Sequence, residues 1–272
     1  MTSSFIPQPS ALLFAWPKQA AFGRVVPKSK IYEHAAVSAA LKERFVQQVE
    51  QINWAYKLAP ETVNLPATPA VTEIHVLRLG LKGASLDQEV LKAIDRAIPF
   101  PLIFELVQGG RIKLVAAYKR PAQNPKSAAD SSPWVVGSYF ETDWQPESSP
   151  RQPLPVALDM AGLYEQLLSP LVQGKVAEAT DDAVAPAPQI RDGATGGYTV
   201  GTPATQPKRL TLEQRIELAE AIASQQKQVE RIKTRLGREK QFNKRVAINA
   251  ELRDAKQELQ RLIEQQADTQ NQ

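Results

Sequence analysis

The feature that most constrains the fold is a break in the spacing of apolar residues in the last quarter of the chain. Two runs there follow the three-four spacing that is typical of a coiled-coil seam. The first run is Leu218, Ile222, Val229, Ile232 and Leu236, with Gln225 at one inward position, and the second is Ile248, Leu252, Ala255, Leu259 and Leu262. Leu236 and Leu252 lie sixteen residues apart, which is two more than two heptads. One straight helix would therefore turn the second seam away from the first.

The residues between the two runs favour a turn. Gly237 is the costliest common residue in a helix after proline. Asn243 can cap a new helix, and Phe242 before it can pack on Ala247 as a hydrophobic staple. The sequence therefore predicts two antiparallel helices, at about 210–236 and 243–267, that fold back on each other as a hairpin.

The predicted turn falls within a strongly basic segment, residues 227–245. This segment has only two acidic residues, Glu230 and Glu239, against eight basic ones. The basic residues are Lys227, Arg231, Lys233, Arg235, Arg238, Lys240, Lys244 and Arg245. Two interpretations fit this pattern. The segment contacts the phosphates of a nucleic acid or an acidic partner protein, or it is only the solvated face of a coiled coil, where Lys and Arg are good helix formers.

Composition divides the chain into four regions. The net charge of the 272 residues is only +4, but residues 147–200 have seven acidic and three basic residues and are rich in Pro, Gly, Ala, Ser and Thr. Such a segment buries too little apolar surface to fold alone. We expect an irregular N-terminal arm over 1–30, a globular domain over 31–170, a disordered linker over 171–207 and the helical hairpin over 208–268.

The globular region alternates helix and strand patterns. The predicted elements are a helix over 35–56, a strand over 71–79, a helix opened by Ser85 and Gln88 that ends at Pro99, a β-hairpin over 101–119, a strand over 134–141, and a helix from Asp159 to Leu168 that Pro170 ends. This order predicts an α+β domain with an antiparallel or mixed sheet and flanking helices.

We predict the register of the β-hairpin by assuming that the apolar residues of both strands lie on one face of the sheet. A three-residue loop, Gln108-Gly109-Gly110, would set Leu106 opposite Ile112 and Glu105 opposite Lys113. A two-residue Gly-Gly loop would mix the two faces. The sequence therefore favours the longer loop.

Catalytic motifs are weak. A metal-dependent nuclease would need clustered carboxylates and a lysine, but Arg111 and Ala117 stand two residues before the strand lysines Lys113 and Lys119. Convergence of Glu73, Glu105, Glu141 and Asp143 stays open as an alternative. The two histidines, His34 and His75, lie on different predicted elements and have no nearby ligands at the spacing of a metal site. The chain has no Cys and no phosphate-binding glycine loop. We expect no metal, no cofactor and no catalytic residue.

Several stretches together resemble a known family. They are FGRVVPKSKIYEH, INWAYKLAPETVNL, AIPFPLIFEL, KLVAAYK and REKQFNKRVAINAELR. This combination is similar to a bacterial domain-of-unknown-function family, number four-three-nine-one. The resemblance implies no activity. It implies a genetic context beside helicases and DNA methyltransferases in restriction-modification or phage-defence clusters.

The sequence thus favours a cytoplasmic accessory protein without enzymatic activity. Its basic hairpin tip would bind nucleic acid or a partner such as a helicase or DNA methyltransferase, and Lys28 and Lys30 form a secondary basic spot. No apolar run is long enough to cross a bilayer. The alternatives are a nuclease with its site on the sheet, and a structural protein that self-associates through its C-terminal helices.

Overall fold

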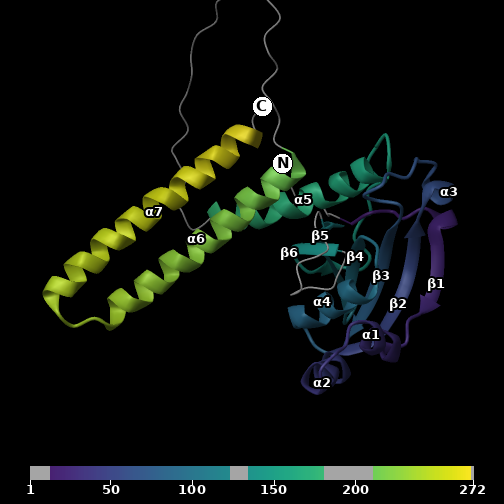
Figure 1. Ribbon diagram of the computed structural model, residues 1–272, viewed down its shortest axis with the longest axis horizontal. Coiled ribbons are helices and arrows are strands. Elements are labelled where there is room, and N and C mark those ends of the chain that lie inside the picture. The colour runs from purple at the N-terminus through teal and green to yellow at the C-terminus, as the bar shows by residue number, and fades with distance from the viewer. Residues whose placement is uncertain (1–12, 123–133, 181–210, 271–272) are drawn as a thin grey trace, which may run out of the picture. The chain divides into compact units, whose positions relative to one another are not determined.

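The computed structural model describes residues 13–122, 134–180 and 211–270 (Figure 1). The chain divides into two compact units, residues 1–175 and residues 176–272. The predicted linker over 171–207 lies mostly outside the described residues, because only 171–180 are described and they are helical.

The first unit is built on a mixed seven-stranded sheet. Its strands are β1 (Ala21–Val25), β2 (Val49–Leu58), β3 (Ile74–Leu81), β4 (Leu102–Gln108), β5 (Arg111–Pro121), β6 (Trp134–Glu141) and β7 (Gln145–Pro146). The first six pair in sequence order, and β7 pairs with β5. The pair of β3 and β4 is parallel, and the other pairs are antiparallel. The predicted α+β class with a mixed sheet is confirmed.

Helices accompany the sheet. They are η1 (Lys18–Ala20), α1 (Lys28–His34), α2 (Ala39–Gln48), α3 (Pro60–Val63), α4 (Gln88–Ala97) and α5 (Met160–Thr180). Helix α4 makes the crossover that a parallel strand pair requires. Residues of α1, α2 and α4, such as Ile31, Phe45 and Ile94, pack in one core with Leu77 and Phe104 of the sheet. Because side chains alternate along a strand, Arg78 and Glu105 lie on the opposite face.

The predicted helix over 35–56 is wrong in its second half. Helix α2 ends at Gln48, and strand β2 begins at Val49. The register between β2 and β3 shifts between Val49 and Gln51. A bulge of this kind adds a residue to one strand, so Val49 and Ile52 share the core although they are three residues apart. That spacing imitates a helical stripe.

The predicted register of the β4–β5 hairpin is also wrong. Gln108 pairs with Arg111, and the loop is Gly109-Gly110 with φ values of 56° and 73°. Both residues take the left-handed conformation that a two-residue type I′ turn needs and that glycine adopts without strain. Glu105 consequently pairs with Leu114. The assumption of one apolar face failed because residues 102–106 of β4 are buried on both faces.

The ends of the first unit are more ordered than we expected. Of the predicted irregular arm over 1–30, residues 1–12 lie outside the described residues, whereas residues 13–30 contain η1, β1 and the start of α1. Phe14 bridges to Gln152. Asp159 caps α5 as predicted, since its Oδ1 accepts the Gly162 N–H at 2.8 Å. Pro170 does not end α5, which continues to Thr180. At α4 the cap is Asp87, not Ser85.

The second unit is the predicted helical hairpin. Helix α6 (Leu212–Arg238) and helix α7 (Phe242–Gln270) are joined by residues 239–241. The buried seam contains Val229, Ile232, Ile248 and Ala255, and Leu236, Leu252 and Leu259 pack against it. The inward Gln225 donates from Nε2 to the Ala255 carbonyl at 3.0 Å. Among the described residues, no helix has the length and apolar content that crossing a bilayer would need.

Candidate nucleic-acid interface

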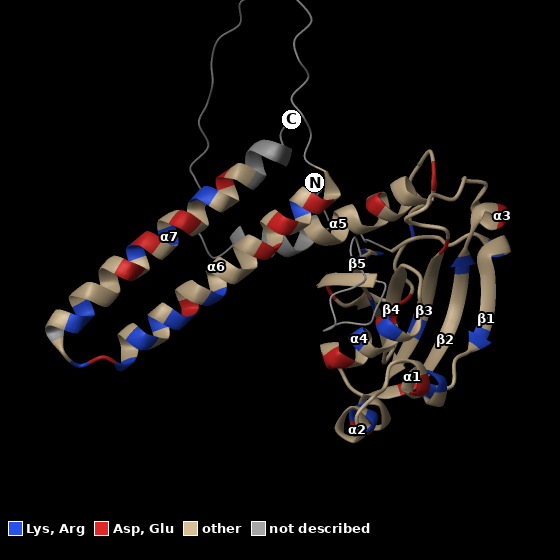
Figure 2. Ribbon diagram, viewed as in Figure 1, with Lys and Arg blue, Asp and Glu red and all other residues tan. Residues whose placement is uncertain are grey.

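The hairpin tip, which we define as residues 227–245, contains all eight basic residues of the predicted binding segment. Helix α6 supplies Lys227, Arg231, Lys233, Arg235 and Arg238, the connection supplies Lys240, and the first turn of α7 supplies Lys244 and Arg245. All eight are exposed. Figure 2 shows Lys and Arg gathered on both helices toward the connection, which itself contains an acidic residue, and Asp and Glu mixed with Lys and Arg farther along the helices.

The connection is held by one of the two acidic residues of the tip. Glu239 is the C-cap of α6, and its Oε1 accepts the backbone N–H groups of Lys240 and Gln241, each at 2.9 Å. The Gln241 N–H, together with that of Lys240 and the charge of Lys244, holds the pKa of Glu239 below its usual range. This carboxylate therefore stabilises the turn.

Among the described residues, only two of the eight basic residues of the tip form ion pairs. Lys233 pairs with Glu230 at 2.5 Å, and Arg235 of α6 pairs with Glu251 of α7. The other six make no ion pair within the part of the chain that the structure describes. Cations near the end of α6 are favoured by the helix dipole, but that effect does not neutralise their mutual repulsion. A polyanion bound at the tip would neutralise this repulsion.

The secondary basic spot is engaged within the fold. Lys28 is half-buried and donates from Nζ to the Val49 carbonyl at 2.5 Å, at the end of α2. Burial, with the nearby charge of Lys82, lowers the pKa of Lys28. Lys30 pairs with Glu33 at 3.0 Å. Lys28 therefore caps a helix, and we do not place it in the interface.

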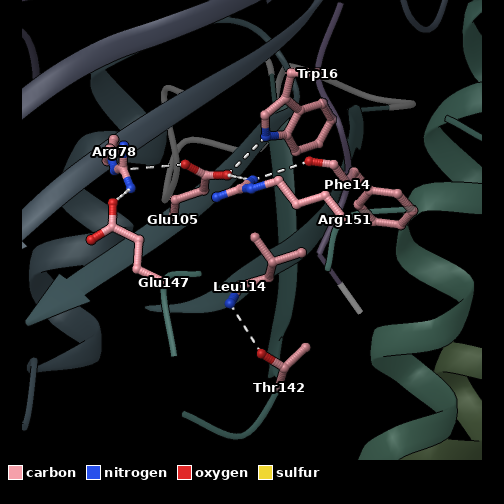
Figure 3. Close-up of polar contacts among 8 residues, drawn as sticks. All are labelled: Phe14, Trp16, Arg78, Glu105, Leu114, Thr142, Glu147 and Arg151. Atoms are coloured by element: carbon pink, nitrogen blue, oxygen red, sulfur yellow. Dashed lines mark hydrogen bonds and ion pairs between the residues drawn. The ribbon is translucent and has the colours of Figure 1, made fainter. Parts of the chain in front are cut away.

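Glu105, the central carboxylate of the nuclease alternative, is surrounded by donors (Figure 3). Its side chain is 2% exposed. Oε1 accepts from Trp16 Nε1 at 2.8 Å and from Arg151 Nη1 at 3.0 Å, and Oε2 lies 3.8 Å from Arg78 Nε. Arg78 also pairs with Glu147. Both oxygens thus face cations, and the predicted pairing with Lys113 does not occur.

The other candidate carboxylates are separate. Glu141 pairs with Lys113 at 2.8 Å, Glu73 pairs with Lys57 at 2.9 Å, and Asp143 is exposed on the loop after β6. No group of three or more His, Asp or Glu residues suited to a metal occurs among the described residues. Glu73, Glu105 and Glu141 are each paired with basic side chains instead.

His75 is a buried structural residue on β3. Its ring lies between Trp54 and Phe100, with centroid distances of 4.4 and 4.5 Å. Nε2 lies 2.9 Å from Glu73 Oε2, but burial outweighs this contact and lowers the pKa of His75 to about 4. The ring is therefore neutral at pH 7. His34 is the last residue of α1.

A buried polar cluster at the end of α4 was not found from the sequence. Lys119 of β5 donates from Nζ to the carbonyls of Asp95 and Ile98, each at 2.5 Å, and Tyr139 donates to Asp95 Oδ2 at 2.5 Å. Burial raises the pKa of Asp95 to about 6, and burial lowers the pKa of Lys119. The only sequence signal is a lysine at the end of the apolar run KLVAAYK. Lys119 satisfies the last carbonyls of α4.

Comparison with known proteins identifies the family. The family model described as Domain of unknown function (DUF4391) matches residues 14–259. The match spans both units, so the chain belongs to this family, as the sequence motifs indicate. No curated protein and no solved structure matches the chain.

Proposed function

We propose that the protein binds nucleic acid through the hairpin tip, as a non-enzymatic accessory subunit. One observation carries this proposal. Six exposed basic residues toward the closed end of a two-helix hairpin form no ion pair within the described part of the chain, although Lys244 lies near the Glu239 carboxylate. Phosphate groups would supply the missing negative charge, and release of their counterions would favour binding.

The rest of the hairpin supports this interpretation over a merely solvated face. On α7, beyond the tip, Arg253 lies 4.0 Å from Asp254 and Arg261 lies 2.7 Å from Glu258. A surface that serves only solubility is expected to mix both signs in this way. The tip departs from the pattern within the same hairpin. The departure is local, so it does not follow from the overall charge of the chain.

The family's genetic context suggests the setting of this activity. We propose that the protein works in the cytoplasm beside a helicase or a DNA methyltransferase of a restriction-modification or phage-defence system. The tip would hold the assembly on nucleic acid, and the partner would perform the reaction. Affinity capture of the full chain, with and without nuclease treatment, tests this setting. Recovery of no such enzyme would contradict it.

Binding by the tip is tested with fluorescence anisotropy of labelled duplex and single-stranded DNA at several salt concentrations. The full chain is compared with a variant carrying Arg231→Gln, Arg235→Gln, Arg238→Gln and Lys240→Gln. We expect micromolar binding at low salt, which is typical of sequence-independent contacts. In the variant, the log-log slope of affinity against salt should lose up to about 2.7 units, at about 0.9 for each of Arg231, Arg238 and Lys240, because Arg235 is paired with Glu251.

A matched control replaces charges of the same hairpin outside the tip. The triple variant Arg253→Gln, Arg261→Gln and Lys256→Gln should bind as the natural protein does. Far-ultraviolet circular dichroism should show equal helicity in all three proteins. The proposal fails if the natural chain does not bind, or if the control variant loses as much affinity as the tip variant.

A further inference from the structure

We infer that the nucleic acid bound at the tip is double-stranded and lies along a row of cations on the outer side of α6. This inference rests on the proposed function and narrows it. The cationic row, as we define it, consists of Lys227, Arg231 and Arg238. These residues are exposed, and they have no ion pair among the described residues. The row faces away from α7.

The position of the row follows from the helix seam. Val229 and Leu236 belong to the contact with α7. Lys227 and Arg231 each stand two residues from Val229, and Arg238 stands two residues from Leu236. Two residues turn about 200° around a helix, so all three cations project away from the seam. Arg235 stands one residue from Leu236, about 100° away, and it reaches Glu251 across the seam.

The length of the row matches several phosphates of one duplex strand. Lys227 and Arg238 are eleven residues apart, which corresponds to about 16 Å along the helix axis. One strand of a duplex places a phosphate about every 3.4 Å along its axis. Because that strand also turns once around the duplex axis in about 10 base pairs, only its phosphates on the side that faces α6 are within reach of the straight row. The three cations can each contact a different one of these phosphates.

The composition of the hairpin disfavours a single-stranded ligand. Proteins that hold single strands combine cations with aromatic side chains on which bases stack. Phe242 is the only aromatic residue between residues 211 and 270. One aromatic residue provides at most one stacking platform. The row, in contrast, offers only cations. These match the regular series of phosphates along a duplex backbone. DNA and RNA duplexes share this chemistry.

Glu251 limits the strength of the contact. Its carboxylate pairs with Arg235 beside the row and places a negative charge near the phosphates. Replacing Glu251 by Gln removes that charge and frees Arg235 for a fourth phosphate contact. We expect Glu251→Gln to bind duplex more tightly than the natural protein and to steepen its salt slope by about 0.9. A solvated face without a ligand would show no such gain.

The test measures salt-dependent anisotropy on four ligands: duplex DNA, duplex RNA, oligo-dT and single-stranded RNA. The natural chain is compared with a row variant (Lys227→Gln, Arg231→Gln, Arg238→Gln) and a turn variant (Lys240→Gln, Lys244→Gln, Arg245→Gln). Each variant removes three charges. We expect at least one duplex to bind more tightly than both single strands. The row variant should lose about 2.7 units of duplex salt slope, and the turn variant should lose less.

Three results overturn the inference. If oligo-dT or single-stranded RNA binds as tightly as the duplexes, and Phe242→Ala abolishes that binding, the ligand is single-stranded and the proposed function stands. If the turn variant loses as much slope as the row variant, the assignment to the outer side of α6 is wrong, although tip binding stands. If the natural chain binds none of the four ligands, the proposed function falls as well.

Discussion

Replacing Glu105 by Gln distinguishes a structural carboxylate from a catalytic one. Gln keeps the volume of the side chain and an oxygen that can accept from Trp16 Nε1, now 2.8 Å from the carboxylate. It removes the negative charge between Arg78 and Arg151. Breaking a buried ion pair typically costs about 3–5 kcal/mol. The two guanidinium side chains are 35% and 27% exposed, so water replaces part of the interaction. We expect Glu105→Gln to lower the free energy of unfolding by about 2–4 kcal/mol.

The assay is urea unfolding followed by tryptophan fluorescence. All four Trp residues lie in the first unit, so the signal reports the sheet domain within the full chain. The matched control is Glu147→Gln. Its carboxylate pairs with Arg78 but is 41% exposed, and such pairs contribute less than about 1 kcal/mol.

The reasoning is refuted if Glu105→Gln is no less stable than Glu147→Gln. The nuclease alternative predicts the opposite pattern for Glu105→Gln. A nuclease would lose Mg²⁺-dependent cleavage of DNA while keeping most of its stability, whereas we expect a loss of stability and no change in cleavage. The two measurements on one variant therefore separate the two interpretations.

Three further changes test the buried groups. Burial lowers the pKa of His75 to about 4, so on acidification the unfolded chain binds a proton before the folded chain does. The free energy of unfolding should therefore fall by about 3 kcal/mol as the pH drops from about 6.5 to 4. In the variant His75→Phe, the urea midpoint should depend less on pH over this range. Tyr164→Phe should lower the free energy of unfolding, measured with urea, by about 2–4 kcal/mol. The Tyr164 hydroxyl donates to the Ala117 carbonyl at 2.7 Å and accepts the Lys119 N–H at 3.1 Å, and both groups would lose their partner. Ile232→Ala should cost about 2–5 kcal/mol and lower the thermal midpoint of helix loss seen by circular dichroism, because its side chain is buried in the hairpin seam. An unchanged value in any of the three would contradict the role given to that side chain.

The helical hairpin was predictable because the apolar residues that specify its helices and its turn lie close together in the sequence. The spacing of Val229, Ile232 and Leu236 marks a seam, and the mismatch with Leu252 requires a turn. The turn came slightly later than Gly237, since α6 continues to Arg238 and Glu239 supplies the cap. The local pattern did not indicate that the Glu239 carboxylate would accept the backbone N–H groups of Lys240 and Gln241 in the connection. The pattern did indicate that the basic residues would gather at the tip.

The sheet domain was less predictable because its register is set by contacts distant in sequence. A bulge in β2 gave Val49 and Ile52 a helical spacing. Burial of β4 on both faces removed the polar-apolar alternation on which the hairpin register relied. The donors to Glu105 come from Trp16 and Arg151, which are 89 and 46 residues away. Nothing in the local sequence of β4 indicates them.

Binding of a duplex by the hairpin tip predicts a strong dependence of affinity on salt concentration. The measurement is the log-log slope of association constant against salt concentration for the full natural chain on a labelled DNA duplex. If Lys227, Arg231 and Arg238 of the cationic row each contact a phosphate, the slope should be about −2.7, and weaker contacts by Lys240, Lys244 and Arg245 would make it steeper. A steep slope that flattens when Arg231, Arg235, Arg238 and Lys240 are replaced by Gln supports binding by the tip. A slope near zero, or a steep slope that the replacements leave unchanged, contradicts it.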